Sequence, residues 1–155
     1  MMSARIDYAK AAPGVVKAMS GLEQYLASCG LEPALLDLVR LRASYLNGCA
    51  YCIDMHSKDL RAGGDSEQRV YGLVAWQEAP YYTERERAAL HWTDAVTRIA
   101  EAHVPDEVYA QACEQFSEQE LVNLTLAVVA INGWNRLAIT FRKEPGTYQP
   151  AQHTT

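Results

Sequence analysis

Residues 33–64 read PALLDLVRLRASYLNGCAYCIDMHSKDLRAGG, and this stretch predicts two helices that meet at a sharp turn. Apolar residues recur at helical spacing from Leu35 to Leu46, after a proline of the kind that suits a first helical turn. Asn47-Gly48 ends this helix. A second helix should begin near Cys49 and stop at Gly63-Gly64, because glycine tolerates the left-handed backbone of a helix end.

The helical period also covers the rest of the chain. Val15 to Leu26 predict a helix that Gly30 closes, Pro105 opens a short helix, and a final helix should run to about residue 142. Three N-terminal capping boxes are predicted, in which a side-chain oxygen and a carboxylate or amide three residues later cap each other: Asp65 with Gln68, Thr83 with Glu86, and Ser117 with Glu120. No stretch alternates as a strand would. We therefore predict one all-α domain of about seven helices over residues 1–155, with a loose polar tail from residue 145.

Composition excludes several classes of protein. The 155 residues are 49% apolar and 21% charged, and 14 Lys and Arg against 19 Asp and Glu give a net charge of −5. This balance argues against nucleic acid or a membrane as the main partner. The most apolar stretch, residues 121–131, is shorter than the roughly 20 residues of a membrane span. Asp7 precedes any apolar signal core, so we expect a cytoplasmic protein, in which paired cysteines call for a redox or metal explanation.

Three side chains with redox chemistry share one helix face. Cys49, Cys52 and His56 fall at positions i, i+3 and i+7 if the helix begins near Cys49. The unpaired N–H groups of a first turn favour a thiolate, and a histidine can relay the thiol proton at neutral pH. Asp37 on the preceding helix is the nearest upstream carboxylate for this relay, and Asp54 is another candidate.

The residues from Leu38 to Ser44, followed by Asn47-Gly48-Cys49-Ala50-Tyr51-Cys52 and then His56, resemble the core of the alkyl hydroperoxidase D (AhpD)-like proteins. These belong to the carboxymuconolactone decarboxylase superfamily. An acidic residue twelve positions before the first cysteine, here Asp37, belongs to the same pattern. The region from Ser117 to Leu137, with Asn132-Gly133-Trp134-Asn135-Arg136, is similar to the peroxidase-related branch.

This resemblance implies an all-helical protein that reduces organic hydroperoxides through a Cys49–Cys52 disulfide, in antioxidant defence. Cys52 would be the peroxidatic thiol, Cys49 the resolving thiol, and His56 with Asp37 the proton relay. The resemblance further implies a homo-oligomer, trimer or hexamer, that needs no metal or organic cofactor. Its disulfide would be reduced by an external dithiol, either a thiol/disulfide reductant protein or a small molecule. Two positions depart from the family, which commonly has Glu at Asp37 and, in its best-known hydroperoxidases, His at Tyr51.

Other interpretations stay open at this stage. One is a carboxymuconolactone-type decarboxylase, which would not need two thiols. Another is a non-enzymatic redox-sensing or zinc-binding oligomer, in which the motif supplies three zinc ligands. Three further residues could supply a fourth ligand: His91, His103 and Cys113. Trp134 is expected to serve as core or oligomer packing, or else as a wall of the substrate pocket, and Tyr51 to shape access.

Overall fold

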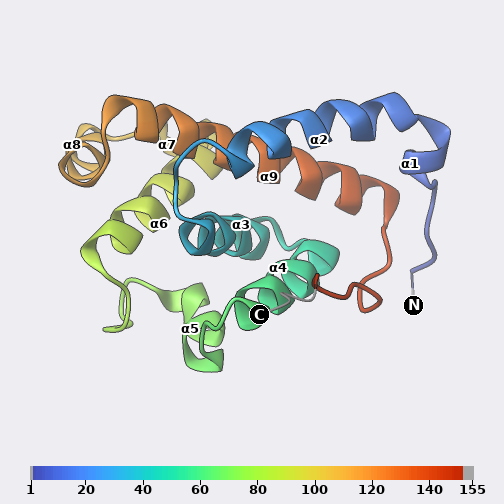
Figure 1. Cartoon of the computed structure of the whole chain (residues 1–155), viewed down its shortest axis with the longest axis horizontal. Coiled ribbons are helices and arrows are strands. Elements are labelled where there is room, and N and C mark those ends of the chain that lie inside the picture. Colours follow the sequence, from blue (N-terminus) through green and yellow to red (C-terminus); the bar gives the residue numbers. More distant parts are fainter. Residues whose placement is uncertain (1, 152–155) are drawn as a thin grey trace.

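A computed structural model describes residues 2–151, and all regular structure in that range is helical (Figure 1). The elements are α1 (Tyr8–Ala11), α2 (Pro13–Ala27), α3 (Pro33–Asn47), α4 (Ala50–Ala62), α5 (Glu67–Gly72), the 3-10 helix η1 (Leu73–Ala75), α6 (Glu84–Thr97), α7 (Ile99–Ala102), α8 (Asp106–Gln115) and α9 (Glu118–Phe141). The all-α prediction is confirmed. The predicted count of seven is too low for residues 2–151, because α1 and α7 are single turns that carry no helical repeat of apolar residues.

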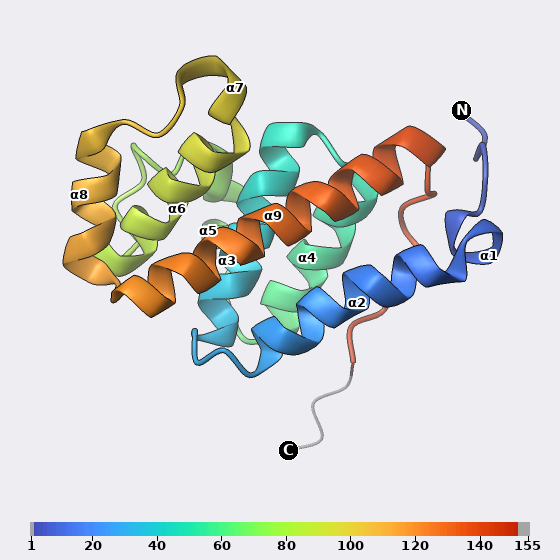
Figure 2. The ribbon, with the colours of Figure 1, turned by 90° about the horizontal axis from the view of Figure 1, so that it is seen from above.

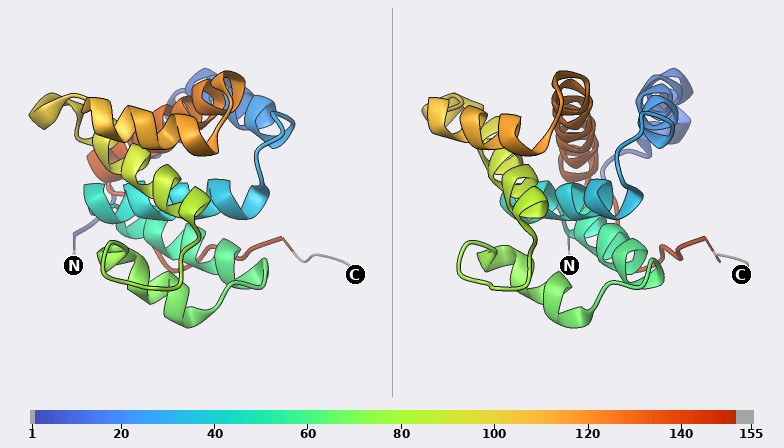
Figure 3. Two further views of the ribbon diagram at one scale, coloured as in Figure 1. Left: turned by 90° about the vertical axis from the view of Figure 1, so that its left-hand side faces the viewer. Right: turned by 60° about the vertical axis from the view of Figure 1, so that its left-hand side comes forward.

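The helices pack in two layers around α3. Seen from above, α9 crosses α3, with α2 along one side and α6 and α8 on the other (Figure 2). The side views place α2, α8 and α9 above, α4 and α5 below, and α3 between them, with α6 sloping down beside α3 (Figure 3). The main core lies between the layers, where Val39, Leu124 and Val128 are fully buried. α4 packs against both α3 and α9.

Helix α9 is the central helix of this core. Its 24 residues exceed the predicted apolar stretch at both ends, and one 18-residue window has a mean hydropathy of 1.3, enough by length and composition to cross a membrane. Leu124, Val128 and Ile131 are nonetheless buried against neighbouring helices. Ser117 and Glu120 form the predicted capping box at its start. The place of α9 in the core therefore explains these buried apolar residues, whereas Val122, Val129 and Ile139 on the same helix are exposed.

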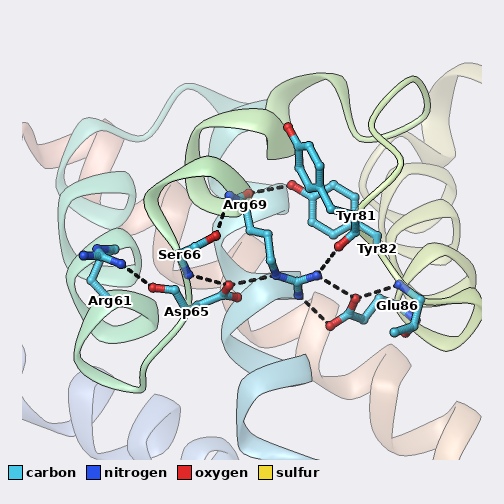
Figure 4. Close-up of polar contacts among 8 residues, drawn as sticks. Arg61, Asp65, Ser66, Arg69, Tyr81, Tyr82 and Glu86 are labelled. Carbon is cyan, nitrogen blue, oxygen red and sulfur yellow. Dashed lines mark hydrogen bonds and ion pairs between the residues drawn. The ribbon is translucent and has the colours of Figure 1, made fainter.

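The predicted cap at Asp65 is wrong. Ser66 is the N-cap of α5, and its hydroxyl accepts the N–H of Arg69. Asp65 instead accepts a bond from Arg69 Nε at 2.8 Å (Figure 4). The Arg69 guanidinium also binds Glu86, which forms the predicted capping box with Thr83 at the start of α6. A side-chain ion pair therefore decides which residue caps α5, and it ties α5 to α6.

One face of α3 is sealed by a buried ion pair. Arg42 is 5% exposed and binds both carboxylate oxygens of Asp94 on α6, at 2.6 and 2.9 Å. Its remaining donors reach the carbonyls of Leu73 and Val74 in η1, and Trp76 Nε1 donates to Asp94 Oδ2. Every charge here is compensated, so this pair joins three segments into a rigid unit.

The chain after α9 returns to the surface of α4. The Gly146 N–H donates to Asp54 Oδ2 at 3.1 Å, and Lys58 Nζ donates to the Tyr148 carbonyl at 3.0 Å. Tyr148 Oη donates to Asp59 Oδ1 at 2.6 Å. The prediction of a loose tail from residue 145 is therefore wrong for residues 146–148. Residues 152–155 of that predicted tail lie outside the described residues.

Candidate active site

The turn between α3 and α4 places the two cysteines at the start of a helix. Gly48 ends α3 with φ +67°, a left-handed conformation that favours glycine, and the Cys49 N–H then bonds to the Ser44 carbonyl. Cys49 is the N-cap of α4, and its Sγ accepts the N–H of Cys52 at 3.4 Å. The two cysteines are joined by a disulfide, with Cα atoms 5.3 Å apart. The predicted start of this helix near Cys49 is confirmed.

A buried amide cluster holds this turn against α9. Asn47 Nδ2 donates to Asn132 Oδ1 and Asn135 Oδ1, both at 2.9 Å. Asn135 is fully buried, and its amide donates to Ser44 Oγ at 3.1 Å. The asparagines of the 132–136 motif thus position the last turn of α3, which leads directly into the turn that carries Cys49.

A cavity of about 460 Å³ opens beside the dithiol. Cys52 and His56 lie on its wall, together with Asp37 from α3, whereas Cys49 is 1% exposed and lies behind it. Most of the remaining wall is apolar, contributed by Val16, Ala27, Met55, Ile131 and Ala138. The structure therefore brings three of the four predicted site residues to one cavity and leaves Cys49 bonded to Cys52 from the buried side.

A chain of polar contacts forms another part of the cavity wall. Arg40 donates to Asp37 Oδ1 and to Glu23 Oε2, each at 2.9 Å. Trp134 Nε1 donates to Glu23 Oε1 at 3.2 Å. Trp134 therefore lines the cavity, which was one of the two roles expected for it. Tyr51 and Lys143 also line the cavity, and Lys143 Nζ lies 4.5 Å from the centre of the Tyr51 ring.

His56 lies between two carboxylates. Its Nδ1 is buried and has no hydrogen-bond partner among the described residues, and the nearest Asp59 oxygen is 3.6 Å away. Burial raises the pKa of Asp37, although Arg40 and His56 oppose this shift. Burial also acts to raise the pKa of Asp59, but the nearby His56 ring and the hydrogen bond from Tyr148 outweigh it, and the pKa is lowered. The two carboxyl groups thus differ in how readily they ionise.

The alternative residues weighed from the sequence lie elsewhere. Asp54 binds Lys58 at 3.0 Å and the Gly146 N–H, and it does not line the cavity. His91 hydrogen-bonds Gln111 on α8. Within residues 2–151, neither His91, His103 nor Cys113 joins the cysteines in a group that could hold a metal.

The group of side chains best placed to hold a cation is Asp37, His56 and Asp59, whose ligand atoms lie within 4.8 Å of one another. Arg40 already places a positive charge 2.9 Å from Asp37, and Tyr148 occupies one Asp59 oxygen. A metal ion would meet the repulsion of the guanidinium. The donor set therefore fits the holding of a proton better than the holding of a divalent cation.

Four residues of the site were missed from the sequence: Glu23, Arg40, Asp59 and Tyr148. Asp59 stands three residues after His56 and could have been found as its neighbour on one helix face. Glu23 and Tyr148 have no such signal, because α2 and the C-terminal segment reach the site only through the packing of the chain.

The sequence profile of the carboxymuconolactone decarboxylase family matches residues 13–95, more than half of the chain. The chain belongs to this family. YdfG of Bacillus subtilis (strain 168), an uncharacterized family relative, is 41% identical over 138 residues, which are 89% of this chain and 94% of YdfG. The alkyl hydroperoxide reductase AhpD of Acidobacterium capsulatum is 32% identical over 81 residues, which are 52% of this chain and 39% of AhpD.

A solved structure extends the likeness to the whole fold. The crystal structure of ATU0492 from Agrobacterium tumefaciens, a protein of unknown function connected by name with AhpD and antioxidant defence, has a TM-score of 0.91 and 48% identity. The match covers 94% of this chain and 100% of that chain. The AhpD-like fold and the resemblance read from the sequence are both confirmed.

Proposed function

We propose that this protein is a thiol-dependent hydroperoxide reductase that acts in antioxidant defence. The observation that carries the proposal is the placement of Cys52, His56 and a carboxylate on one largely apolar cavity, with Cys49 bonded to Cys52 from behind. The apolar wall suits the organic part of an alkyl hydroperoxide. Family membership and the likeness to AhpD support the same chemistry.

The reaction assigns different roles to the two cysteines. In the reduced protein, His56 takes the thiol proton of Cys52, and the thiolate attacks the terminal peroxide oxygen. The O–O bond breaks, Cys52 becomes a sulfenic acid, and the alkoxide takes a proton from the imidazolium and leaves as an alcohol. Cys49 sulfur then attacks Cys52 sulfur and water leaves, which gives the disulfide. Both cysteines are buried, and their positions support this order, because Cys52 lines the cavity and Cys49 does not.

The cycle closes when an external dithiol reduces the Cys49–Cys52 disulfide by thiol–disulfide exchange. The proposed cycle uses no metal or organic cofactor. It places the protein in a reducing compartment, the cytoplasm, as a homo-oligomer of the trimeric or hexameric kind implied by the resemblance.

The test is peroxide consumption by the reduced protein with tert-butyl hydroperoxide and dithiothreitol. Cys52→Ser should abolish turnover, while Cys49→Ser should leave a sulfenic acid at Cys52 that oxidises further. Cys113→Ser is the matched control, since Cys113 is an exposed free cysteine away from the cavity. Full activity of Cys52→Ser would refute the mechanism, and activity retained on a lactone acid without both cysteines would favour a decarboxylase.

A further inference from the structure

The C-terminal segment touches the relay from the side opposite the dithiol cavity. Tyr148 does not line that cavity but lines a second hollow of about 910 Å³, into which Asp37 and Asp59 also face. The two carboxylates therefore separate the hollows. Because the Gly146 N–H and the Tyr148 carbonyl are each bonded to α4, the Tyr148 side chain is held at this boundary.

The two carboxylates near His56 have different partners. Asp37 Oδ1 accepts a hydrogen bond from the Arg40 guanidinium, which also donates to Glu23. Asp59 Oδ1 accepts the Tyr148 hydroxyl at 2.6 Å, and Asp59 Oδ2 lies 3.6 Å from the unpartnered Nδ1 of His56. Catalytic hydrogen bonds are often this long in sites without substrate and tighten in the complex with substrate.

We propose that Tyr148 is a positioning residue of the relay, which holds Asp59 against Nδ1 of His56 so that the other ring nitrogen, Nε2, exchanges the proton of Cys52. This inference rests on the proposed function. Asp59 stays ionised and stabilises the imidazolium, as a carboxylate does beside a catalytic histidine. Tyr148 acts only through Asp59 and does not touch the substrate.

The charges around Asp59 agree with this role. On its own helix it faces His56, and from α3 it faces Arg40 and Asp37. From the C-terminal segment it receives the Tyr148 hydroxyl. Burial opposes ionisation of Asp59, yet the hydrogen bond from Tyr148 and the nearby His56 ring leave its pKa lowered, so a fixed negative charge stands behind the imidazole at neutral pH.

The same surroundings separate the roles of the two acids. Burial raises the pKa of Asp37, and its best contact is with Arg40 rather than with the ring. The carboxylate assigned to the relay from the sequence therefore belongs to the polar wall of the cavity. Asp59 is the one that the tail fastens beside the ring.

The experiment uses reduced full-length protein and two rates, measured across pH: alkylation of Cys52 by iodoacetamide, and reaction with tert-butyl hydroperoxide. Tyr148→Phe should move the alkylation profile to higher pH, because an imidazolium without a fixed carboxylate supports the thiolate less well. The peroxide rate at neutral pH should fall roughly tenfold. Asp59→Asn should shift the profile further in the same direction.

Tyr25→Phe is the matched control. Tyr25 Oη donates to Asn123 Oδ1 at 2.8 Å, so this variant also loses a hydrogen bond between a tyrosine hydroxyl and a side-chain oxygen, away from the cavity. Its two rates should equal those of the wild type. In a double-mutant cycle, Tyr148→Phe should add nothing to Asp59→Asn, because Tyr148 acts through that carboxylate.

The outcomes separate the two proposals. A Tyr148→Phe profile that coincides with that of Tyr25→Phe, or that moves to lower pH, would overturn the positioning role. Additive effects in the double variant would overturn it as well. Wild-type protein that is inert to the hydroperoxide, while Tyr148→Phe still shifts the alkylation profile and adds nothing to Asp59→Asn, would reject the peroxidase function and support the positioning role.

Discussion

Arg40 and Arg42 stand two residues apart on α3 and face different surroundings. Arg42 lies on the sealed side, where Asp94 and two carbonyls satisfy it and the pair is nearly inaccessible. Arg40 lies on the cavity side and bridges Glu23 and Asp37, both part-buried. Positions i and i+2 project from nearly opposite sides of a helix. One helix thus carries a guanidinium that fixes the fold and one that shapes a site.

The largest effect on stability is expected at Arg42. Arg42→Met leaves the buried Asp94 carboxylate without its counter-charge, which should lower the free energy of unfolding by about 3–5 kcal/mol. Urea denaturation of the reduced protein measures this loss. A loss below about 1 kcal/mol, the range typical of surface pairs, would show that the pair does not hold the fold together.

The second-largest effect is expected in the amide cluster behind the dithiol turn. Asn135→Ala removes one of the two acceptors of Asn47 and the donor to the buried Ser44 hydroxyl, and leaving buried polar groups unsatisfied costs about 1–3 kcal/mol. The same variant should slow disulfide closure after peroxide addition, because the turn before Cys49 loses its support. Unchanged stability together with an unchanged closure rate would contradict this role.

Arg40→Met should lower activity more than stability, the reverse of what is expected for Arg42→Met. Its ion pairs are partly solvated, so the free energy of unfolding should change by no more than about 1 kcal/mol. The rate of peroxide reduction should fall roughly tenfold, since Asp37 and Glu23 lose the cation that orders the cavity wall. A variant that unfolds as easily as Arg42→Met, or that keeps its full rate, would remove the distinction between the two arginines.

The smallest predicted effects concern the pH dependence of stability and have opposite signs at the two acids. Burial raises the folded-state pKa of Asp37, so the wild-type protein loses stability as pH rises through that pKa. The stability of Asp37→Asn relative to wild type should therefore increase from about pH 4 upward. The folded-state pKa of Asp59 is lowered, because the hydrogen bond from Tyr148 and the nearby His56 ring outweigh burial. Asp59→Asn should therefore be less stable than wild type at neutral pH, and this deficit should vanish as pH falls through the folded pKa, below about 3.8.

Urea midpoints of the wild type and both variants, taken from roughly pH 3 to 7, measure these differences. The comparison between variants removes the contribution of all other titrating groups. Shifts of the same sign at the two positions would contradict the electrostatic distinction drawn between them.

Local patterns predicted most of the fold. The helix ends at Gly48 and near Cys49, and the capping boxes at Thr83 and Ser117, depend on neighbours a few residues away. The cap at Asp65 was mispredicted because Arg69, itself tied to Glu86 on another helix, takes that carboxylate. The local rule fails here because a side chain that also binds another helix takes the capping carboxylate.

The site was predictable only in part for a similar reason. Cys49, Cys52 and His56 lie on one helix, and their spacing was sufficient to group them. Glu23 and Tyr148 are distant from that motif in sequence, and no spacing rule connects them to it. The tail was predicted to be loose because its sequence is polar, whereas two of its backbone groups and the Tyr148 hydroxyl bind side chains of α4.

The most direct measurement is the intact mass of the reduced protein before and after one equivalent of tert-butyl hydroperoxide, followed by peptide mapping. A working peroxidatic pair loses about two daltons, and the loss maps to the peptide that joins Cys49 and Cys52. Thiols that remain free, with no change in mass, would contradict hydroperoxide reduction by this dithiol. So would oxygen added only at Cys29 or Cys113.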